Sequence, residues 1–282
     1  MSTQPINKQL SCLGAVKRNQ CNNRPPIRSV AFVYSCRDRS GSMSSYGSAT
    51  AQSLYDSIQD HKKNSTDNNV NVIYSLTTFD TKAEHPYIST DIHDISMTLE
   101  EAQEHVKPRN LTRLYATAME ELAKLRRDVK AEKRTNPNVV GVFELHTDGQ
   151  DNKSKPFTSM DLNSAVTAAR NEGITCIFAG ANQDAVTIGE QYGFDRDLSL
   201  TTDSTTQNAS TGLRMASQAV MRACSGAPPQ FTQTMRQISA PGYSSYDTAS
   251  GAALLAMSNS PPPTSLRSTA TMMPPPLTRQ TN

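Results

Sequence analysis

The stretch AFVYSCRDRSGSM, residues 31–43, decides how the rest of the chain is interpreted. Its apolar first half is typical of a strand buried on both faces, and Asp38, Ser40 and Ser42 follow where such a strand would enter a loop. In open α/β sheets, ligands bind at the edge where the parallel strands end. One carboxylate and two hydroxyls so close together suit a hard cation such as Mg²⁺. The same side chains could instead cap the next helix.

Outward from this stretch, strand and helix patterns alternate along the chain. Apolar runs and two-residue alternation predict strands, and apolar residues three or four positions apart predict helices between them. This order favours an α/β fold: an open, three-layer, doubly wound, mostly parallel six-stranded sheet flanked by helices. The predicted strands are residues 29–36, 70–79, 82–90, 139–147, 174–179 and 198–200, and the predicted helices are residues 48–62, 98–105, 113–133, 158–172, 184–191 and 205–224.

The two ends of the chain differ from its middle in composition. Residues 1–27 show no lasting periodicity and carry only basic charges, so we expect a flexible basic arm before a domain at residues 28–224. Residues 225–282 are rich in Pro, Ser and Thr, which predicts a disordered tail. Its proline clusters could dock onto proline-binding modules or simply be solvated. The net charge of +2 does not argue for a nucleic-acid partner, and none is expected.

The cysteines and the apolar content bear on location. The 5 cysteines of the chain form no close pair, which favours a reducing compartment. No amino-terminal run is typical of a signal peptide, and no apolar stretch reaches the roughly 18 residues of a membrane span. We therefore expect a cytoplasmic protein that does not contact a membrane.

Two later positions strengthen the interpretation as a metal site. Asp148 follows the predicted strand at residues 139–147, as Asp38 follows the first strand, and Thr112 lies on a loop just before a long helix. If those two strands are neighbours, the crevice of a doubly wound sheet opens between them. Two carboxylates and three hydroxyls would then converge from three loops. A cation held directly by neutral hydroxyls, with the carboxylates acting through water, would be electron-poor and would favour an outside carboxylate.

These residues resemble a known motif. The segment at residues 38–42, Asp-Arg-Ser-Gly-Ser, together with Thr112 and Thr147-Asp148-Gly149, resembles the metal-ion-dependent adhesion site (MIDAS) of von Willebrand factor A (vWA) domains. The resemblance covers about residues 29–224 and preserves the order of the motifs. It implies a mostly parallel six-stranded sheet flanked by helices, with Mg²⁺ or Mn²⁺ at its carboxyl edge.

The resemblance also implies a role for each residue of the motif. Ser40, Ser42 and Thr112 would contact the cation directly or nearly so, and Asp38 and Asp148 would act through water. A Glu or Asp of a protein partner would complete the shell. Arg37, directly before the motif, departs from the family's apolar strand and would need a carboxylate partner or a local bulge.

Other polar residues near the motifs are expected to have structural roles. Asp80, after the second strand, is predicted to be a turn or cap residue. Asp151 and Asn152 could lie near the rim of the site. His146 is predicted to lie in the core or at the rim, because the 5 histidines show no zinc spacing.

Three functions are compatible with this sequence. The complete set of five residues favours a non-enzymatic module that binds metal and captures an acidic side chain of a partner protein. An Mg²⁺-dependent hydrolase is the second, with Asp38 or Asp148 as base and Arg39 and Arg113 as the only cations beside the motif, although each is expected to be a surface residue. A scaffold with a vestigial metal site is the third. The sequence does not predict an oligomeric state.

Overall fold

The computed structural model describes residues 29–149, 151–181, 184–203 and 206–241. The predicted basic arm and the tail beyond residue 241 lie outside the described residues. The described part forms one six-stranded sheet with the strand order β3-β2-β1-β4-β5-β6, parallel except for the edge strand β3. The strands are β1 (Ser29–Asp38), β2 (Val70–Phe79), β3 (Ala83–Asp91), β4 (Val139–Thr147), β5 (Thr175–Ala181) and β6 (Ser199–Thr202).

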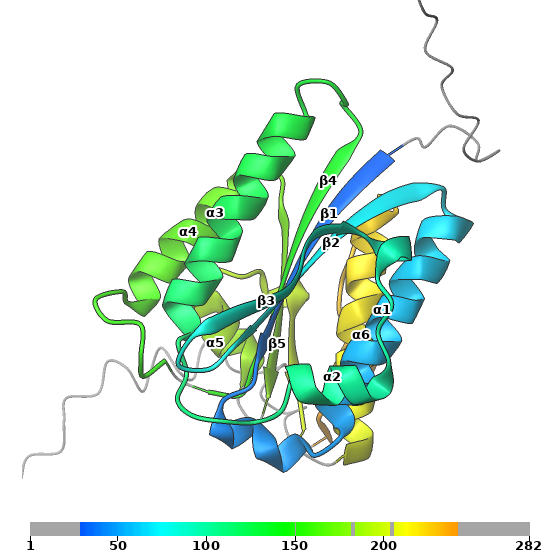
Figure 1. Cartoon of the computed structure of the whole chain (residues 1–282). Helices are drawn as coiled ribbons and strands as arrows, with labels where there is room; N and C mark the ends of the chain where they lie inside the picture. The colour runs from blue at the N-terminus through cyan, green and yellow to red at the C-terminus, as the bar shows by residue number, and fades with distance from the viewer. Residues whose placement is uncertain (1–28, 150, 182–183, 204–205, 242–282) are drawn as a thin grey trace, which may run out of the picture.

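Helices cover both faces of the sheet, so the fold has three layers (Figure 1). The helices α1, α2, α6 and α7 cover one face, and α3, α4 and α5 cover the other. No helix in the described ranges is long and apolar enough to cross a membrane. The bounds are α1 (Ala49–Asp67), α2 (Leu99–His105), α3 (Leu114–Glu132), α4 (Ser159–Asn171), α5 (Ala185–Gln191), α6 (Thr206–Cys224) and α7 (Gln233–Ser239), with short 3₁₀ turns η1 (Gly41–Tyr46), η2 (Ile92–Asp94) and η3 (Arg196–Leu198).

The central strand β1 shows why the sequence adopts this architecture. Ala31 and Val33 pack into the core beneath α1 and α6, while Tyr34 and Cys36 pack into the core beneath α3 and α4. Successive side chains of a strand point to opposite faces, so a strand covered on both sides must be apolar throughout. The predicted α/β fold with a mostly parallel six-stranded sheet is confirmed.

The carboxyl end of the domain differs from the sequence prediction, which begins the tail at residue 225. The chain continues past Cys224 and adds α7, which packs against α6 and β6. Phe231 is buried in the core, and the Ser239 hydroxyl donates to the Thr201 carbonyl at 2.7 Å. The Arg236 guanidinium donates to the Ser199 carbonyl at 2.7 Å. Residues 225–241 are therefore part of the packed domain.

Candidate metal site

The candidate site lies at the carboxyl edge of the sheet, where β1 and β4 end side by side. β1 pairs in parallel with β2 on one side and with β4 on the other. The chain thus winds away from β1 in one direction and later returns to its other side. This reversal is the position at which doubly wound sheets open a crevice. The first and fourth strands are thus neighbours, which is the condition under which the sequence predicts that the motifs converge.

Asp38 is held in a fixed orientation at the end of β1. The Thr147 hydroxyl donates to its Oδ2 at 2.6 Å, and the Ser40 backbone N–H donates to its Oδ1 at 2.7 Å. The residue is only 2% exposed, and this burial raises the pKa of its carboxyl to about 6, although the bonds from Thr147 and Ser40 oppose the shift. A cation that needs the charged carboxylate would therefore compete with a proton in mildly acidic solution.

A chain of hydrogen bonds links the first motif to the third. The hydroxyls of Ser40 and Ser42 lie 3.1 Å apart, and the Ser42 hydroxyl donates to Asp148 Oδ1 at 2.8 Å. Burial also raises the pKa of Asp148, against the opposing effect of the Ser42 bond. Asp38, Ser40, Ser42 and Asp148 thus form one continuous polar cluster across the ends of β1 and β4.

Thr112 completes the set from the loop that precedes α3. A Cβ atom added to Gly149 would lie 3.8 Å from both the Ser42 and the Thr112 hydroxyl oxygens, so the two hydroxyls face the same point. Asn152 holds Thr112 there: its side-chain Oδ1 accepts from the Thr112 N–H at 2.8 Å, and its own N–H donates to the Thr112 carbonyl at 3.0 Å. Asp151 accepts from the Tyr115 N–H at 3.2 Å, at the start of α3. Asp151 and Asn152 therefore position the loop that carries Thr112.

The donor set fits a hard cation. In the described part of the chain, no three His, Cys, Asp or Glu side chains gather as a metal site. The cluster offers two carboxylates and three hydroxyls, all oxygen donors, as Mg²⁺ and Mn²⁺ prefer. Within the same described ranges, neither Asp38 nor Asp148 is in an ion pair with a basic side chain. Two partly or fully buried carboxylates without a countercharge are a suitable environment for a cation.

Arg37 pairs with a carboxylate of the neighbouring strand β4 and not with the carboxylates of the candidate metal site. Its guanidinium pairs with Glu144 at 3.3 Å and lies 3.2 Å from His146 Nδ1. It also donates to Ser35 Oγ at 3.0 Å and to Ser53 Oγ of α1 at 3.4 Å. All of these side chains lie between the sheet and α1. The predicted need for a carboxylate partner is met by Glu144, and His146 lies in this buried cluster with no contact to Asp148.

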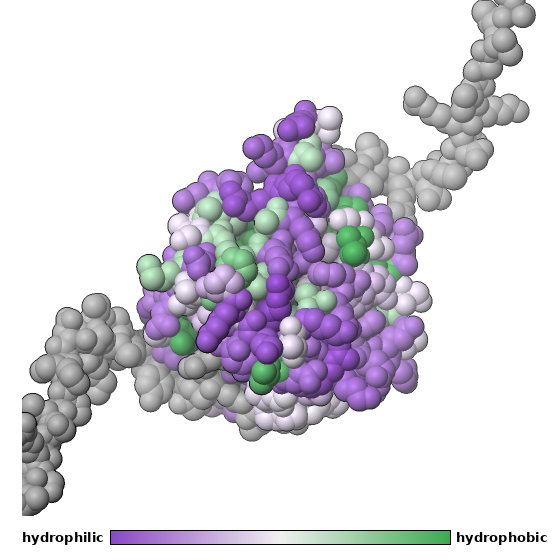
Figure 2. Space-filling model, turned by 60° about the vertical axis from the view of Figure 1, so that its left-hand side comes forward, coloured by the Kyte–Doolittle hydropathy of each residue, from purple (hydrophilic) through white to green (hydrophobic). Residues whose placement is uncertain are grey.

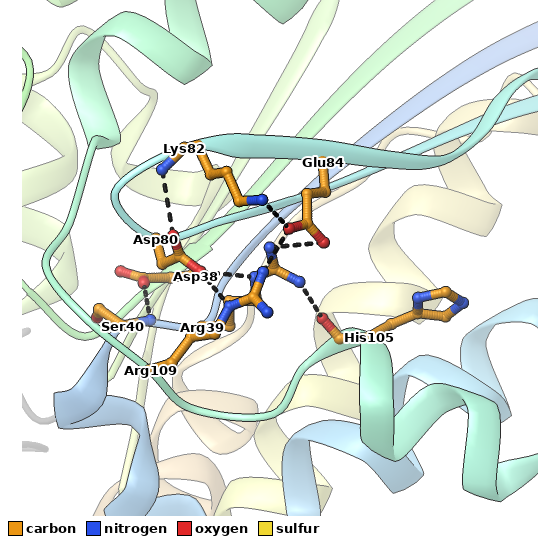
Figure 3. Close-up of polar contacts among 8 residues, drawn as sticks. All are labelled: Asp38, Arg39, Ser40, Asp80, Lys82, Glu84, His105 and Arg109. Carbon is orange, nitrogen blue, oxygen red and sulfur yellow. Dashed lines mark hydrogen bonds and ion pairs between the residues drawn. The ribbon is translucent and has the colours of Figure 1, made fainter.

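The structure differs from the sequence prediction at Arg39 beside the motif, which is expected at the surface and is 2% exposed. Asp80 is a turn residue, as predicted, because its Oδ1 accepts from the Lys82 N–H at 3.1 Å, and it is also completely buried. Arg39 and Asp80 form an ion pair at 3.1 Å, in which Asp80 also binds Arg109 (Figure 3). The local sequence does not indicate these ion pairs, because Arg39, Asp80 and Arg109 come from three separate loops. Arg113 is half-buried and pairs with Glu120 at 2.6 Å.

Comparisons with known proteins leave the family open. No protein-family model and no curated protein matches the chain. Solved structures of proximal thread matrix protein 1 (PTMP1) from the mussel byssus are similar in fold: one is 18% identical over 70% of this chain, with a TM-score of 0.47. A second, described with a zinc-occupied MIDAS motif, is 17% identical over 70% of this chain, also with a TM-score of 0.47. This chain covers 47% and 46% of those chains, about half their length. Its function has to be inferred from its own site.

Proposed function

We propose that this domain is a metal-dependent protein-binding module that holds Mg²⁺ or Mn²⁺ at the carboxyl edge of its sheet. The observation that carries the proposal is the continuous cluster from Asp38 through Ser40 and Ser42 to Asp148, with the Thr112 hydroxyl facing it. Serine and threonine hydroxyls are neutral, so a cation bound by them keeps most of its charge. Such a cation attracts a carboxylate from outside, and a Glu or Asp of a partner protein would supply it.

The surroundings of the cluster support a protein ligand. Leu111, next to Thr112, is 47% exposed, and Phe157, on the loop that carries Asn152, is 41% exposed. These two apolar side chains are available for contact with a partner protein. The face of the molecule in Figure 2 is largely hydrophilic, with hydrophobic side chains scattered among the polar ones. We place this binding in the cytoplasm, without nucleic acid or membrane.

The hydrolase alternative has less support in the arrangement of cations. The two cations beside the motif are held in ion pairs: Arg39 pairs with Asp80, and Arg113 pairs with Glu120. Neither is free to stabilise a developing charge on a phosphate ester. Turnover of a generic phosphate ester that is lost in Thr112→Ala would favour the hydrolase nonetheless.

Calorimetric titration of Mg²⁺ and Mn²⁺ into the full chain tests the metal site. We expect saturable binding in the wild type and none in Asp38→Ala. Asp67→Ala is the matched control, because Asp67 is an exposed carboxylate at the end of α1, and it should bind as the wild type does. No saturable binding in the wild type, or equal binding in both variants, would contradict the proposal.

Partner capture is tested separately with a peptide library. Peptides that contain Glu or Asp should bind the metal-loaded wild type, and the same peptides with Gln or Asn should not. Chelation of the metal should abolish binding. Metal binding without any metal-dependent binding of acidic peptides would instead favour a scaffold.

A further inference from the structure

A cluster of four charged side chains, two of them buried, lies beside the first motif (Figure 3). One carboxylate oxygen, Asp80 Oδ2, accepts from Arg39 Nε at 3.1 Å and from Arg109 Nε at 2.5 Å. Glu84 pairs with Nη2 of Arg39 at 2.9 Å and with Nη2 of Arg109 at 2.5 Å. Asp80 and Arg39 are almost completely buried, whereas the side chains of Arg109 and Glu84 are 41% and 38% exposed. Asp80 is therefore the buried centre of these four residues, which together form the hub.

Three members of the hub, Arg39, Asp80 and Arg109, belong to different loops at the edge of the sheet, and Glu84 lies at the start of β3. Arg39 lies inside the first motif, between Asp38 and Ser40. Asp80 follows β2. Arg109 lies three residues before Thr112, on the loop between α2 and α3. The hub thus ties together the loop that carries the two serines and the loop that carries the threonine.

Backbone hydrogen bonds follow the same connections. The Arg109 N–H donates to the Arg39 carbonyl at 2.7 Å, and the Arg113 N–H donates to the Asp80 carbonyl at 2.8 Å. The Gly41 N–H donates to the Asn110 carbonyl at 3.0 Å. Both ends of the segment that contains Thr112 are therefore attached to the hub residues, and its middle is attached to the serine loop.

We propose that Asp80 is a positioning residue for the candidate metal site. By holding Arg39 and Arg109, it fixes the separation between the serine hydroxyls and the Thr112 hydroxyl. This inference rests on the proposed function, because it assigns a role toward the same cation. Neutral hydroxyls attract a cation weakly, so they bind it well only if their positions are set before it arrives.

The hub also reduces the electrostatic repulsion between the arginines beside the motif and a bound cation. Arg39 and Arg109 place two positive charges beside a site for a cation. Asp80 and Glu84 carry two negative charges within hydrogen-bond distance of them. Lys82 also pairs with Glu84, at 3.0 Å, so the two carboxylates offset the positive charge of the arginines in part.

Two variants distinguish a positioning role of Asp80 from the effect of its negative charge alone. Asp80→Asn and Glu84→Gln each remove one negative charge from the cluster, but Asp80 is completely buried, whereas the side chain of Glu84 is 38% exposed. In calorimetric titrations of the full chain, Asp80→Asn should weaken Mg²⁺ binding by about 10- to 100-fold, the range known for residues that orient metal ligands. Glu84→Gln should stay within about threefold of the wild type, because its charge is half-exposed and screened. Equal losses in both variants would overturn positioning by Asp80.

A second readout uses the metal-free protein. Amide hydrogen exchange at Arg109 and Arg113 should accelerate in Asp80→Asn, while exchange in β1 and β4 stays as in the wild type. If Asp80→Asn does not fold, Arg109→Gln removes the half-exposed arm of the hub and should show both effects in weaker form. Unchanged Mg²⁺ affinity and unchanged exchange in a folded variant would overturn the inference.

The two proposals can fail independently. If the wild type does not bind Mg²⁺, the proposed function fails, but the exchange experiment still decides whether Asp80 orders the Thr112 loop. If the wild type binds Mg²⁺ and Asp80→Asn binds it equally well, only the positioning role fails.

Discussion

At the scale of single residues, the candidate site is flanked by buried ion pairs. On the side of α1, Arg37 of β1 pairs with Glu144 of β4, which lies opposite Ser35 in the register of the two strands. Burial alone would raise the pKa of Glu144, but Arg37 and His146 outweigh it and hold that pKa well below its usual range. The carboxylate therefore stabilises the fold at neutral pH, and this contribution is lost as the pH falls below the usual range of a glutamate. A buried arginine in a central strand is tolerated only because this partner is present.

Glu144→Gln should be strongly destabilising. It leaves Arg37 charged and buried without a carboxylate, and breaking a buried pair in this way costs about 3–5 kcal/mol of the free energy of unfolding. Urea denaturation followed by circular dichroism measures the change. Glu172→Gln is the matched control, because it breaks an ion pair with Arg126 in which both side chains are largely exposed, and should cost less than about 1 kcal/mol. Similar small losses in both variants would contradict this account.

At the scale of the elements, most of the fold follows from sequence periodicity. Thr98, with Glu101 three positions on, begins α2 within the predicted range 98–105, and both bonds of this capping box are present. Gly173, just after α4, has a φ of +84°, which suits glycine. β1 runs two residues further than predicted, to Asp38, because Arg37 pairs within the sheet. The sequence also placed the five oxygen-bearing residues of the site on the loops that the structure brings together.

What the sequence could not predict depends on contacts between distant segments. The 3₁₀ turn η1 has no apolar periodicity to reveal it. The pairing of Arg39 with Asp80 joins residues 41 positions apart, and each looks like an ordinary loop residue by itself. α7 has only seven residues, QTMRQIS, and its polar composition resembles the rest of the tail. Its place in the domain comes from bonds to β6 and η3.

The role of α7 leads to a prediction about chain length. A chain that ends at Cys224 loses Phe231 from the core, together with the bonds from Arg236 to the Ser199 carbonyl and from Ser239 to the Thr201 carbonyl. Burial of an aromatic side chain alone contributes about 1.5–3 kcal/mol. We expect this chain to be less stable than one that ends at Pro241 by about 3 kcal/mol, measured by urea denaturation. Equal stability of the two chains would place the end of the domain at residue 224.

At the scale of the whole molecule, the candidate site and the start of the described chain lie at opposite ends of the sheet. Parallel strands share one direction, so Ser29, the first residue of β1, lies at the amino edge, and Asp38, its last, lies at the carboxyl edge (Figure 1). In the described part of the chain, the large apolar cores on the two faces of the sheet are built from residues between Val30 and Met235. These cores and the five residues of the candidate site lie within residues 29–241.

A chain of residues 29–241 should retain both the fold and the metal affinity. It keeps all six strands, both cores and all five oxygen-bearing residues of the candidate site. It lacks the residues before Ser29, and Ser29 itself lies at the edge of the sheet away from the site. We expect the urea midpoint to match that of the full chain and the dissociation constant for Mg²⁺ to change by less than about twofold. Loss of affinity with an unchanged midpoint would mean that a removed segment supplies a ligand or orders the loops, and the site would then extend beyond the domain.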